Sequence, residues 1–356
     1  MVARRLVLYG GGVLGQRSLF HGFWWTLTES RALRSENVSG GRVNFGRNYG
    51  FINSFKLNVP HFADLYLVGV HFLSCSPIYN VDHLKDSWTV VTGGTDGIGR
   101  AYIEELAKSR GLRKFYLIGR NRQKLDQVVK ELQERYEAEC KTAVFDFECD
   151  SYDKLPQELK DMDVGILINC AGIAPTQVAN FIEMPEGTAS RIFQVNLMSN
   201  VKMLELVLPG MIKRNKGCVV NVSSMTGWRP LPYISAYPAS KAAISFFSDC
   251  LSDEFRHTNV RIQCLIPMLV ATKVASYDVH EANNLFVVTP ENYARQAVRA
   301  LGRFEMITGC VQHDIQIALG TLLSFWVFKL LYVPIIMLGI HKDRVAAYQK
   351  SHSKVA

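Results

Sequence analysis

The sequence predicts an α/β protein, with a doubly wound parallel sheet, helices on both faces and a hydrophobic helical tail at the C-terminus. Three observations carry this prediction. From Trp88 onward, short apolar runs alternate with stretches whose apolar residues recur at helical spacing. A glycine-rich turn, residues 92–99, joins the first apolar run to the first helical stretch. An almost continuous apolar run, residues 315–340, stands near the end of the chain.

Six apolar runs are the expected strands. The first, WTVVTGG, precedes GIGRAYIEELAKSR, whose apolar residues have the spacing of a helix. KFYLIGR gives a second strand, and residues 121–139 give a polar helix. The remaining strands are expected at residues 142–145, 164–168, 218–222 and 260–266. Alternation of strand and helix at this density favours a parallel sheet with helices on both faces.

Composition and charge bound the class of protein. The chain has 356 residues, of which 48% are hydrophobic and 20% charged, so it is long enough for one large folded domain with extensions. Formal charge is +8, but residues 1–59 alone hold eight basic and two acidic side chains. The rest is nearly neutral and has no basic stripe, so a nucleic-acid partner is not expected. The eight cysteines contain no C-x-x-C pair, which predicts reduced thiols in an intracellular protein and no metal site.

The N-terminal part gives the weakest signals. Residues 1–60 are expected to form a basic, poorly structured leader. It fits either a mitochondrial transit peptide or a disordered tail that carries no targeting signal. Residues 61–86 are expected to be a short apolar helix and a linker. The apolar part, residues 62–75, is short for a span of about 20 residues, so an interfacial or core-packed helix is favoured.

The tail, residues 313–356, is expected to associate with a membrane. Its apolar run of 26 residues is long enough to span a bilayer, but it contains Lys329 and Pro334. The lysine could reach the headgroups from a helix lying in the interface. Two alternatives are a hairpin broken near residues 329–334 and a long helix buried at a dimer contact.

Residues 221–241, NVSSMTGWRPLPYISAYPASK, carry the strongest chemical signal. Tyr237 and Lys241 are four residues apart, so they share one face of a helix. An ammonium beside a phenol lowers its pKa from about 10, which suits acid–base chemistry. Ser224 follows an apolar run and could hydrogen-bond the same substrate oxygen. Taken alone, the pair also fits a surface tyrosine and a solvated lysine.

The turn TGGTDGIG, residues 92–99, is suited to hold a dinucleotide. A turn between a strand and a helix lets a pyrophosphate meet the N–H groups of the helix N-terminus. Side chains at Gly93, Gly97 or Gly99 would obstruct that approach. Arg120 follows the second strand, where an arginine suits a ribose 2′-phosphate and an acidic residue suits a 2′-hydroxyl. Arg120 therefore favours NADP(H) over NAD(H), unless it is a solvated surface arginine.

Together these motifs resemble the short-chain dehydrogenase/reductase family over roughly residues 87–312. The wording TDGIG, GILIN, LPGMIKR and LIPMLVAT is similar to its membrane-bound branch, which includes 17β-hydroxysteroid dehydrogenases, very-long-chain 3-oxoacyl-CoA reductases and hydroxysteroid dehydrogenase-like proteins. The resemblance implies a Rossmann-type catalytic domain. It rests on the order and spacing of TGGTDGIG (92–99), Asp146, NCAG (169–172), Asn196 in FQVNL, VSS (222–224), YPASK (237–241) and Pro267.

The resemblance implies a role for each catalytic motif residue. Tyr237 would be the general acid/base, and Lys241 would lower its pKa and hold the nicotinamide ribose. Ser224, rather than Ser223, would orient the substrate oxygen. Asn196 would support a water that links Lys241 to solvent. The implied cofactor-binding residues are Gly93, Thr95, Asp96, Gly97, Ile98, Gly99, Arg120, Asp146, Asn169, Gly172, Tyr237, Lys241, Pro267 and Thr272.

Within this set, four residues have finer roles by resemblance. Asp146 would touch the adenine, and Asn169 and Gly172 would line the adenosine ribose. Thr272 would contact the nicotinamide carboxamide. Met268 occupies a position where the family often has glycine, and its side chain would narrow the space for the nicotinamide ring.

The resulting prediction is an NADP(H)-dependent oxidoreductase that interconverts a lipophilic ketone and alcohol, of the steroid or 3-oxoacyl-CoA type. Residues 273–290 would form a lid over the substrate. The alternative is a catalytically silent, nucleotide-binding scaffold on a membrane. The resemblance implies the endoplasmic reticulum membrane, and the basic leader gives the mitochondrion as the alternative. The family usually pairs through the helix that carries Tyr237, so a homodimer is also expected.

Overall fold

The computed structural model describes residues 80–352 apart from residues 230, 283 and 322–324. The chain divides into two units, Met1–Lys56 and Leu57–Ala356, and every described residue belongs to the second. The predicted basic leader, residues 1–60, and the apolar run at 62–75 therefore lie outside the described residues.

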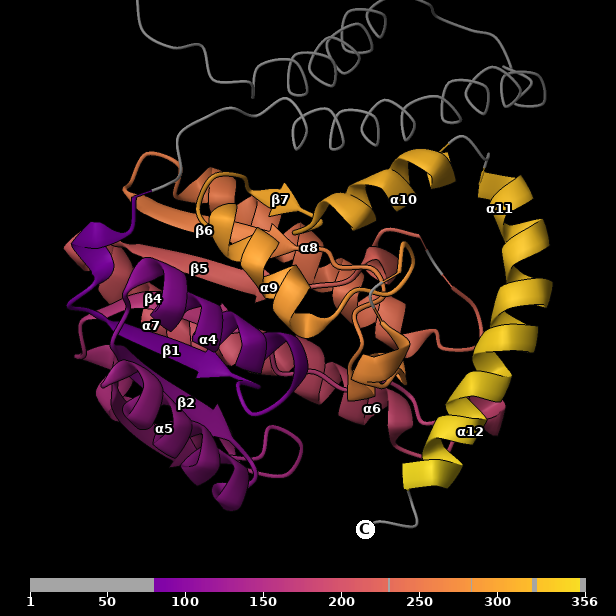
Figure 1. Cartoon of the computed structure of the whole chain (residues 1–356), viewed down its shortest axis with the longest axis horizontal. Helices are drawn as coiled ribbons and strands as arrows, with labels where there is room; N and C mark the ends of the chain where they lie inside the picture. Colours follow the sequence, from indigo (N-terminus) through magenta and orange to yellow (C-terminus); the bar gives the residue numbers. More distant parts are fainter. Residues whose placement is uncertain (1–79, 230, 283, 322–324, 353–356) are drawn as a thin grey trace, which may run out of the picture. The chain divides into compact units, whose positions relative to one another are not determined.

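The second unit is built on a seven-stranded parallel sheet (Figure 1), which confirms the predicted α/β class. Its strand order is β3-β2-β1-β4-β5-β6-β7. Two strands differ from prediction: β3 begins earlier than residue 142, and β7 was not predicted. The strands are β1 Trp88–Thr92, β2 Lys114–Gly119, β3 Glu139–Val144, β4 Val164–Asn169, β5 Gly217–Val222, β6 Val260–Leu265 and β7 Met306–Ile307.

Helices cover both faces of the sheet because the central strands are apolar on both sides (Figure 1). One core cluster joins the sheet to α4, α5 and α9, and a second joins its other face to α7 and α8. The helices are α4 Gly97–Arg110, α5 Arg122–Tyr136, α6 Thr188–Ile192, α7 Ser199–Arg214, α8 Ala236–Glu254 and α9 Pro290–Arg299.

Short helical turns join these elements. Most lie in the connections that follow the strands, and one π-helical turn, η5, joins α6 to α7. They are η1 Asp82–Leu84, η2 Tyr152–Lys154, η3 Gln157–Lys160, η4 Phe181–Glu183, η5 Phe193–Met198, η6 Met225–Gly227, η7 Lys273–Ala275 and η8 Val279–Glu281.

The strand order places a ligand site at one edge of the sheet. The strand order changes side at β1. β2 and β3 lie on one side of β1, and β4 to β7 lie on the other. In open parallel sheets, the loops that leave the carboxyl ends of strands at such a point diverge and leave a crevice. The connections that follow β1 to β6, with the helices in them, contain most of the predicted site residues.

The C-terminal part is helical, as predicted. It contains α10 Val311–Thr321, α11 Phe325–Tyr332, the π-helical turn η9 Val333–His341 and α12 Lys342–His352. The hairpin considered for residues 329–334 is wrong, because the residues that bound η9 on both sides keep right-handed helical dihedrals. α11, η9 and α12 therefore run on as one yellow rod in Figure 1.

Among the helices formed by the described residues, none is both long enough and apolar enough to cross a bilayer.

Candidate active site

The glycine-rich turn between β1 and α4 packs tightly against the chain that leaves β4. Gly93 has a φ of +66°, and a Cβ there would lie 2.8 Å from the backbone of Cys170 and Ala171. A Cβ on Gly99 would lie 2.4 Å from the carbonyl oxygen of Gly93. The Thr92 hydroxyl accepts hydrogen bonds from the amides of Cys170 and Ala171, both at 3.2 Å. The turn can therefore hold this shape only with glycine at these positions.

The N-terminus of α4 is suited to an anion. Asp96 is the N-cap residue but, within the described chain, its side chain does not cap the helix. Its carboxylate instead accepts from Lys124 at 2.6 Å and from Lys273 at 2.8 Å. Gly97 has a φ of +53°, and a Cβ there would lie 2.9 Å from Thr272. The first N–H groups of α4 thus fit a pyrophosphate, with two ammonium groups nearby.

The adenosine side of the site lies at the ends of β2 and β3. Arg120 follows β2 and is 63% exposed, with Nη1 3.9 Å from Glu148 Oε2. Thr95 lies beside Gly119, because a Cβ on that glycine would be 3.6 Å from its methyl group. Asp146 follows β3, and its carboxylate accepts from the amide of Glu148 at 3.0 Å. These are the residues that the resemblance assigns to the adenosine end of a dinucleotide.

Tyr237 and Lys241 lie on the first turns of α8, and Ser224 ends the strand-to-turn connection after β5. The Lys241 ammonium donates to the carbonyl of Val222 at 2.9 Å and lies 5.8 Å from the centroid of the Tyr237 ring. Ser223 uses its hydroxyl to bond the Lys241 carbonyl at 2.6 Å. Ser224 is therefore the serine that faces Tyr237, in line with the choice made from spacing.

The acidity of these groups differs from the sequence prediction. Burial raises the pKa of Tyr237 to about 12, and only the Ser224 hydroxyl opposes this rise. The predicted lowering by Lys241 is wrong in this structure, because the ammonium is bonded to the Val222 carbonyl rather than to the phenol oxygen. Burial lowers the pKa of Lys241 to about 8, so it is mostly cationic at neutral pH. Tyr237 is then a protonated hydroxyl, ready to donate.

Asn196 lies in η5, where the helix takes a π-helical turn. The wider turn places its amide away from the helix ladder, so it bonds both the N–H and the C=O of Ile173, at 2.8 and 3.0 Å. Its amide also donates to Ser240 at 3.1 Å, and Ser240 donates to the carbonyl of Tyr237 at 2.8 Å. π-Helical turns are frequent at functional sites. Here the turn connects the chain after β4 to the start of α8.

The remaining predicted residues have different surroundings. A Cβ on Gly172 would lie 3.5 Å from Lys241 Nζ, so the glycine leaves room beside the ammonium. The Pro267 carbonyl accepts from the amide of Met225. Ile98 packs on the core under α4. Asn169 is turned inward and donates to Asn221 at 3.0 Å, which joins β4 to β5.

His313 belongs to the site but escaped sequence reasoning. It is fully buried, accepts from the Met268 amide at 3.3 Å through Nδ1, and places Nε2 3.3 Å from the Leu269 carbonyl. Burial lowers its pKa to about 4, so it stays neutral with the proton on Nε2. Its two ring nitrogens thus hold the backbone that follows β6 in position. A lone histidine beyond the predicted catalytic domain carries no motif, but Thr92 and Ser240 could have been found from their places beside the motifs.

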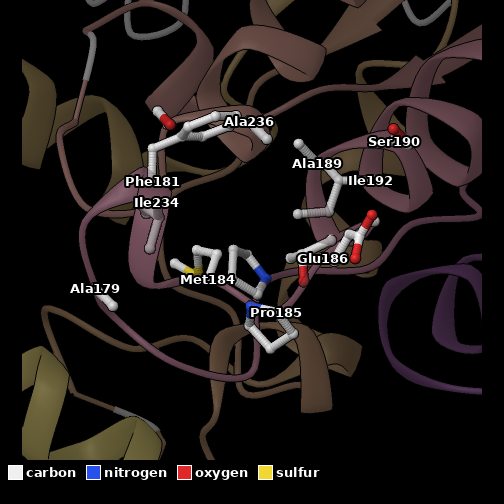
Figure 2. A pocket seen from close by; sticks show the side chains of 14 residues that line it. Ala179, Phe181, Met184, Pro185, Glu186, Ala189, Ser190, Ile192, Ile234 and Ala236 are labelled. Carbon is white, nitrogen blue, oxygen red and sulfur yellow. The ribbon is translucent and has the colours of Figure 1, made fainter.

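An apolar cavity of about 260 Å³ lies between the chain after β4, α6 and the start of α8 (Figure 2). Its wall ends at Ala236, the residue before Tyr237, and includes Ile234. Phe181 and Met184 from the chain after β4 face it, and Ile192 of α6 closes it. The lining is mostly hydrocarbon, so the cavity fits an apolar group better than a sugar or a phosphate.

Comparison with known proteins agrees with this geometry. A family model described as short chain dehydrogenase matches residues 87–283. The very-long-chain 3-oxoacyl-CoA reductase of Mus musculus is 37% identical over 270 residues, which cover 75% of this chain and 83% of that protein. The uncharacterized oxidoreductase dhs-27 of Caenorhabditis elegans is 59% identical over 160 residues, but these are 45% of this chain and only 19% of that protein.

A solved structure shows the same fold. The short-chain dehydrogenase from Sphingobium yanoikuyae, determined with NADPH, is 25% identical, with a TM-score of 0.56 over 62% of this chain and 87% of that one. The parallel sheet, the order of the motifs along it and these relatives agree. The chain is an oxidoreductase that belongs to the short-chain dehydrogenase family, in the branch that includes the very-long-chain 3-oxoacyl-CoA reductases.

Proposed function

We propose that this protein is an NADPH-dependent reductase of a lipophilic ketone, with Tyr237 as the proton donor. The observation that carries the proposal is the placement of Tyr237 and Lys241 on the first turns of α8, with the ammonium 5.8 Å from the centroid of the phenol ring and Ser224 facing the phenol. A nicotinamide cofactor would supply the hydride, and the protein has to supply one proton and orientation.

Each side chain has a task in that reaction. Tyr237 gives its proton to the carbonyl oxygen as negative charge develops there, and Ser224 orients that oxygen. Lys241, cationic at neutral pH, would hold the nicotinamide ribose in place. Asn196 and Ser240 fix the start of α8, so the hydroxyl keeps its position. In the oxidising direction, the deprotonated Tyr237 would accept the hydroxyl proton of the alcohol substrate, and Ser224 would orient its oxygen.

The substrate we propose is a 3-oxoacyl thioester with a long hydrocarbon chain, and a ketosteroid is the second choice. Two features support a lipophilic substrate: the apolar cavity beside Tyr237, and the relative named for very-long-chain 3-oxoacyl-CoA reduction. The test is NADPH oxidation by the purified full chain with 3-oxoacyl thioesters of increasing length and with ketosteroids. If NADPH binds but no ketone is reduced, the chain is a nucleotide-binding scaffold instead.

We further propose that Arg120 selects NADP(H) over NAD(H). The guanidinium is exposed at the end of β2, and Glu148 holds it only loosely at 3.9 Å. Replacing Arg120 with serine should lower kcat/KM for NADPH by about 10- to 100-fold, the value of a charge-assisted contact, and leave the NADH value nearly unchanged. Steady-state kinetics with both cofactors measure this.

The matched control is Lys130→Ser, which removes an exposed cation from α5, the helix that follows Arg120. It should change neither value by more than about twofold. Equal losses with NADPH and NADH in Arg120→Ser would contradict a role in reading the 2′-phosphate.

We also propose that the C-terminal helices rest on a lipid bilayer. One side of the rod packs on the catalytic unit through Met337, which is 1% exposed. Another side presents an aliphatic stripe at helical spacing, where Leu330 is 73% exposed. A helix with apolar residues on both sides and only one side covered needs a second apolar surface. The exposed aliphatic residues are Leu319, Val327, Leu330, Leu331, Ile335 and Ile340.

Flotation with phosphatidylcholine vesicles tests this contact. Leu330→Asp combined with Leu331→Asp should reduce the vesicle-bound fraction at least about tenfold, since each leucine contributes about 1.5–3 kcal/mol when buried. Ala346→Asp, an exposed position on α12, should have little effect. If the wild type does not float but elutes as a dimer that the aspartates dissociate, a second copy covers the stripe and the bilayer proposal is wrong.

The location we propose is the endoplasmic reticulum membrane, by resemblance to the membrane-bound branch. The mitochondrion stays the alternative, because the basic leader is typical of a transit peptide. Fractionation of the tagged full chain decides between them. The homodimer also stays a prediction.

A further inference from the structure

The last described segment, residues 325–352, contacts the connections that follow β4, β5 and β6. Here it is called the C-terminal segment. It lies beyond the residues that match the family, 87–283. It meets the loop after β4 at Val178, the loop after β5 at Leu231 and Ile234, and the chain after β6 at residues 277–281. An appendage that served only as an anchor would have no need of these contacts.

The first two contacts are apolar. Met337 and Val345, 1% and 4% exposed, form one buried cluster with Val178, Leu231 and Ile234. Ile234 also lines the apolar cavity beside Tyr237 (Figure 2). The C-terminal segment therefore supports the outer side of a residue whose other side faces that cavity.

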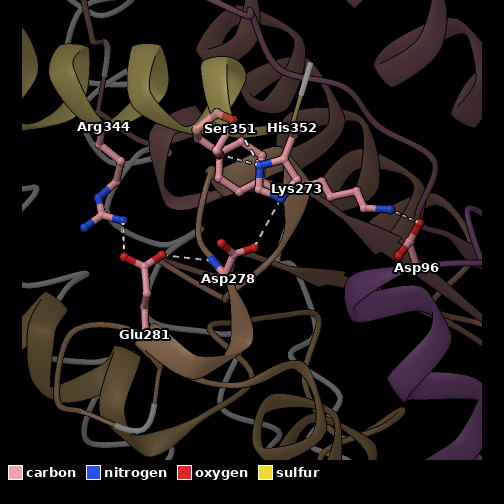
Figure 3. A network of polar contacts seen from close by, with 8 residues as sticks. Asp96, Lys273, Asp278, Glu281, Arg344, Ser351 and His352 are labelled. Atoms are coloured by element: carbon pink, nitrogen blue, oxygen red, sulfur yellow. Dashed lines mark hydrogen bonds and ion pairs between the residues drawn. The ribbon is translucent and has the colours of Figure 1, made fainter. Parts of the chain in front are cut away.

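The third contact is polar and holds residues 273–282, here called the lid arm (Figure 3). The Arg344 guanidinium donates to Glu281 at 2.7 Å and stacks over the Tyr277 ring, 4.0 Å from its centroid. Glu281 also accepts from the Asp278 amide at 3.0 Å. His352 Nε2 lies 3.5 Å from the Asp278 carboxylate. α12 thus contacts the lid arm at two places, Arg344 with Glu281 and His352 with Asp278.

The opposite end of the lid arm is fixed at the cofactor side. Lys273 donates to Asp96 at 2.8 Å, and Asp96 precedes the first helical residue of the glycine-rich turn. The lid arm therefore runs between two attachments, one to the glycine-rich turn and one to α12 (Figure 3). A segment tied at both ends keeps its position at low entropic cost when substrate binds.

We propose that the C-terminal segment is an outer wall of the substrate site, and that Arg344 positions the lid arm over that site through Glu281. This inference rests on the proposed function, because it concerns access to the ketone site. Arg344 is a positioning residue, since it touches neither Tyr237 nor the glycine-rich turn among its contacts in the described chain. Loosening the lid arm should weaken substrate binding more than it slows the chemical step.

The test reverses the charges of the pair in the full chain. Arg344→Glu should raise KM for a long-chain 3-oxoacyl thioester about tenfold, with kcat within about twofold of wild type, as expected for losing a partly buried charge-assisted contact. Glu281→Arg should do the same. The double variant Arg344→Glu with Glu281→Arg restores the ion pair and should recover most of the KM. NADPH affinity should stay unchanged throughout.

Hydrogen exchange gives a readout that needs no substrate. Amides of the lid arm should exchange at least about fivefold faster in Arg344→Glu and return toward the wild-type rate in the double variant. Arg135→Glu, which breaks a 2.6 Å pair between α5 and α4, is the matched control and should leave the lid arm unchanged. If lid-arm exchange and KM do not change in Arg344→Glu, or if the double variant fails to recover, the inference is wrong. If no ketone is reduced by wild type while exchange responds as expected, the proposed function fails and the positioning of the lid arm stands.

Discussion

Tyr237→Phe should lower turnover by about 10³-fold while leaving NADPH affinity within about twofold of wild type. The substitution removes only the hydroxyl, and the ring keeps its packing beside the Lys241 ammonium. The reaction then lacks its proton donor, and Ser224 is a far weaker acid in that position. Single-turnover oxidation of bound NADPH by a 3-oxoacyl thioester measures the chemical step, and cofactor fluorescence measures binding.

Tyr136→Phe is the control for this loss, since that hydroxyl, at the C-terminal end of α5, donates to Glu104 of α4 at 3.4 Å. It should turn over at the wild-type rate. Undiminished turnover by Tyr237→Phe would remove the basis of the proposed mechanism.

Gly99→Ala should weaken NADPH binding by about 10- to 100-fold and destabilise the fold by about 1–3 kcal/mol. A Cβ at this position would lie 2.4 Å from the Gly93 carbonyl oxygen, so either the turn or the start of α4 has to move. That movement also displaces the N–H groups that would meet the pyrophosphate. Fluorescence titration with NADPH and chemical denaturation measure the two effects.

Gly320→Ala is its matched control, because no described atom lies within 4 Å of a Cβ there. It sits in α10, where alanine favours the helix over glycine by up to about 1 kcal/mol, so stability should stay equal or rise. An equal loss of NADPH affinity in both variants would show that the glycine-rich turn is not the binding element.

The central sheet could be predicted because its strands are buried on both faces and read as short apolar runs. β4 and β5 are buried at every residue. β3 began earlier than predicted, because as the edge strand it has only one neighbour and alternates exposed and half-buried side chains. β7 has two residues and gives no period to recognise. Strand detection from sequence follows burial rather than backbone conformation.

The sequence could predict that Tyr237, Lys241 and Ser224 lie near one another, but not their electrostatics. Spacing along the chain brought Tyr237, Lys241 and Ser224 together. It could not show that Lys241 turns toward the Val222 carbonyl, or that burial dominates the acidity of the phenol. The support by His313 was also hidden, because it depends on a contact between α10 and the chain after β6.

The C-terminal contacts have a consequence for biosynthesis. Val178 and Val345 share one buried cluster, although a large part of the sequence separates them. Contacts between such distant residues form late, because the closure of a long loop comes before any gain from the contact. On a ribosome that makes the chain from its N-terminus, the sheet can assemble while α12 is still in the exit tunnel. The buried cluster that α12 completes is therefore expected to form later than the sheet, so a nascent chain carries Tyr237, the proposed proton donor, before the contacts of α12 are in place.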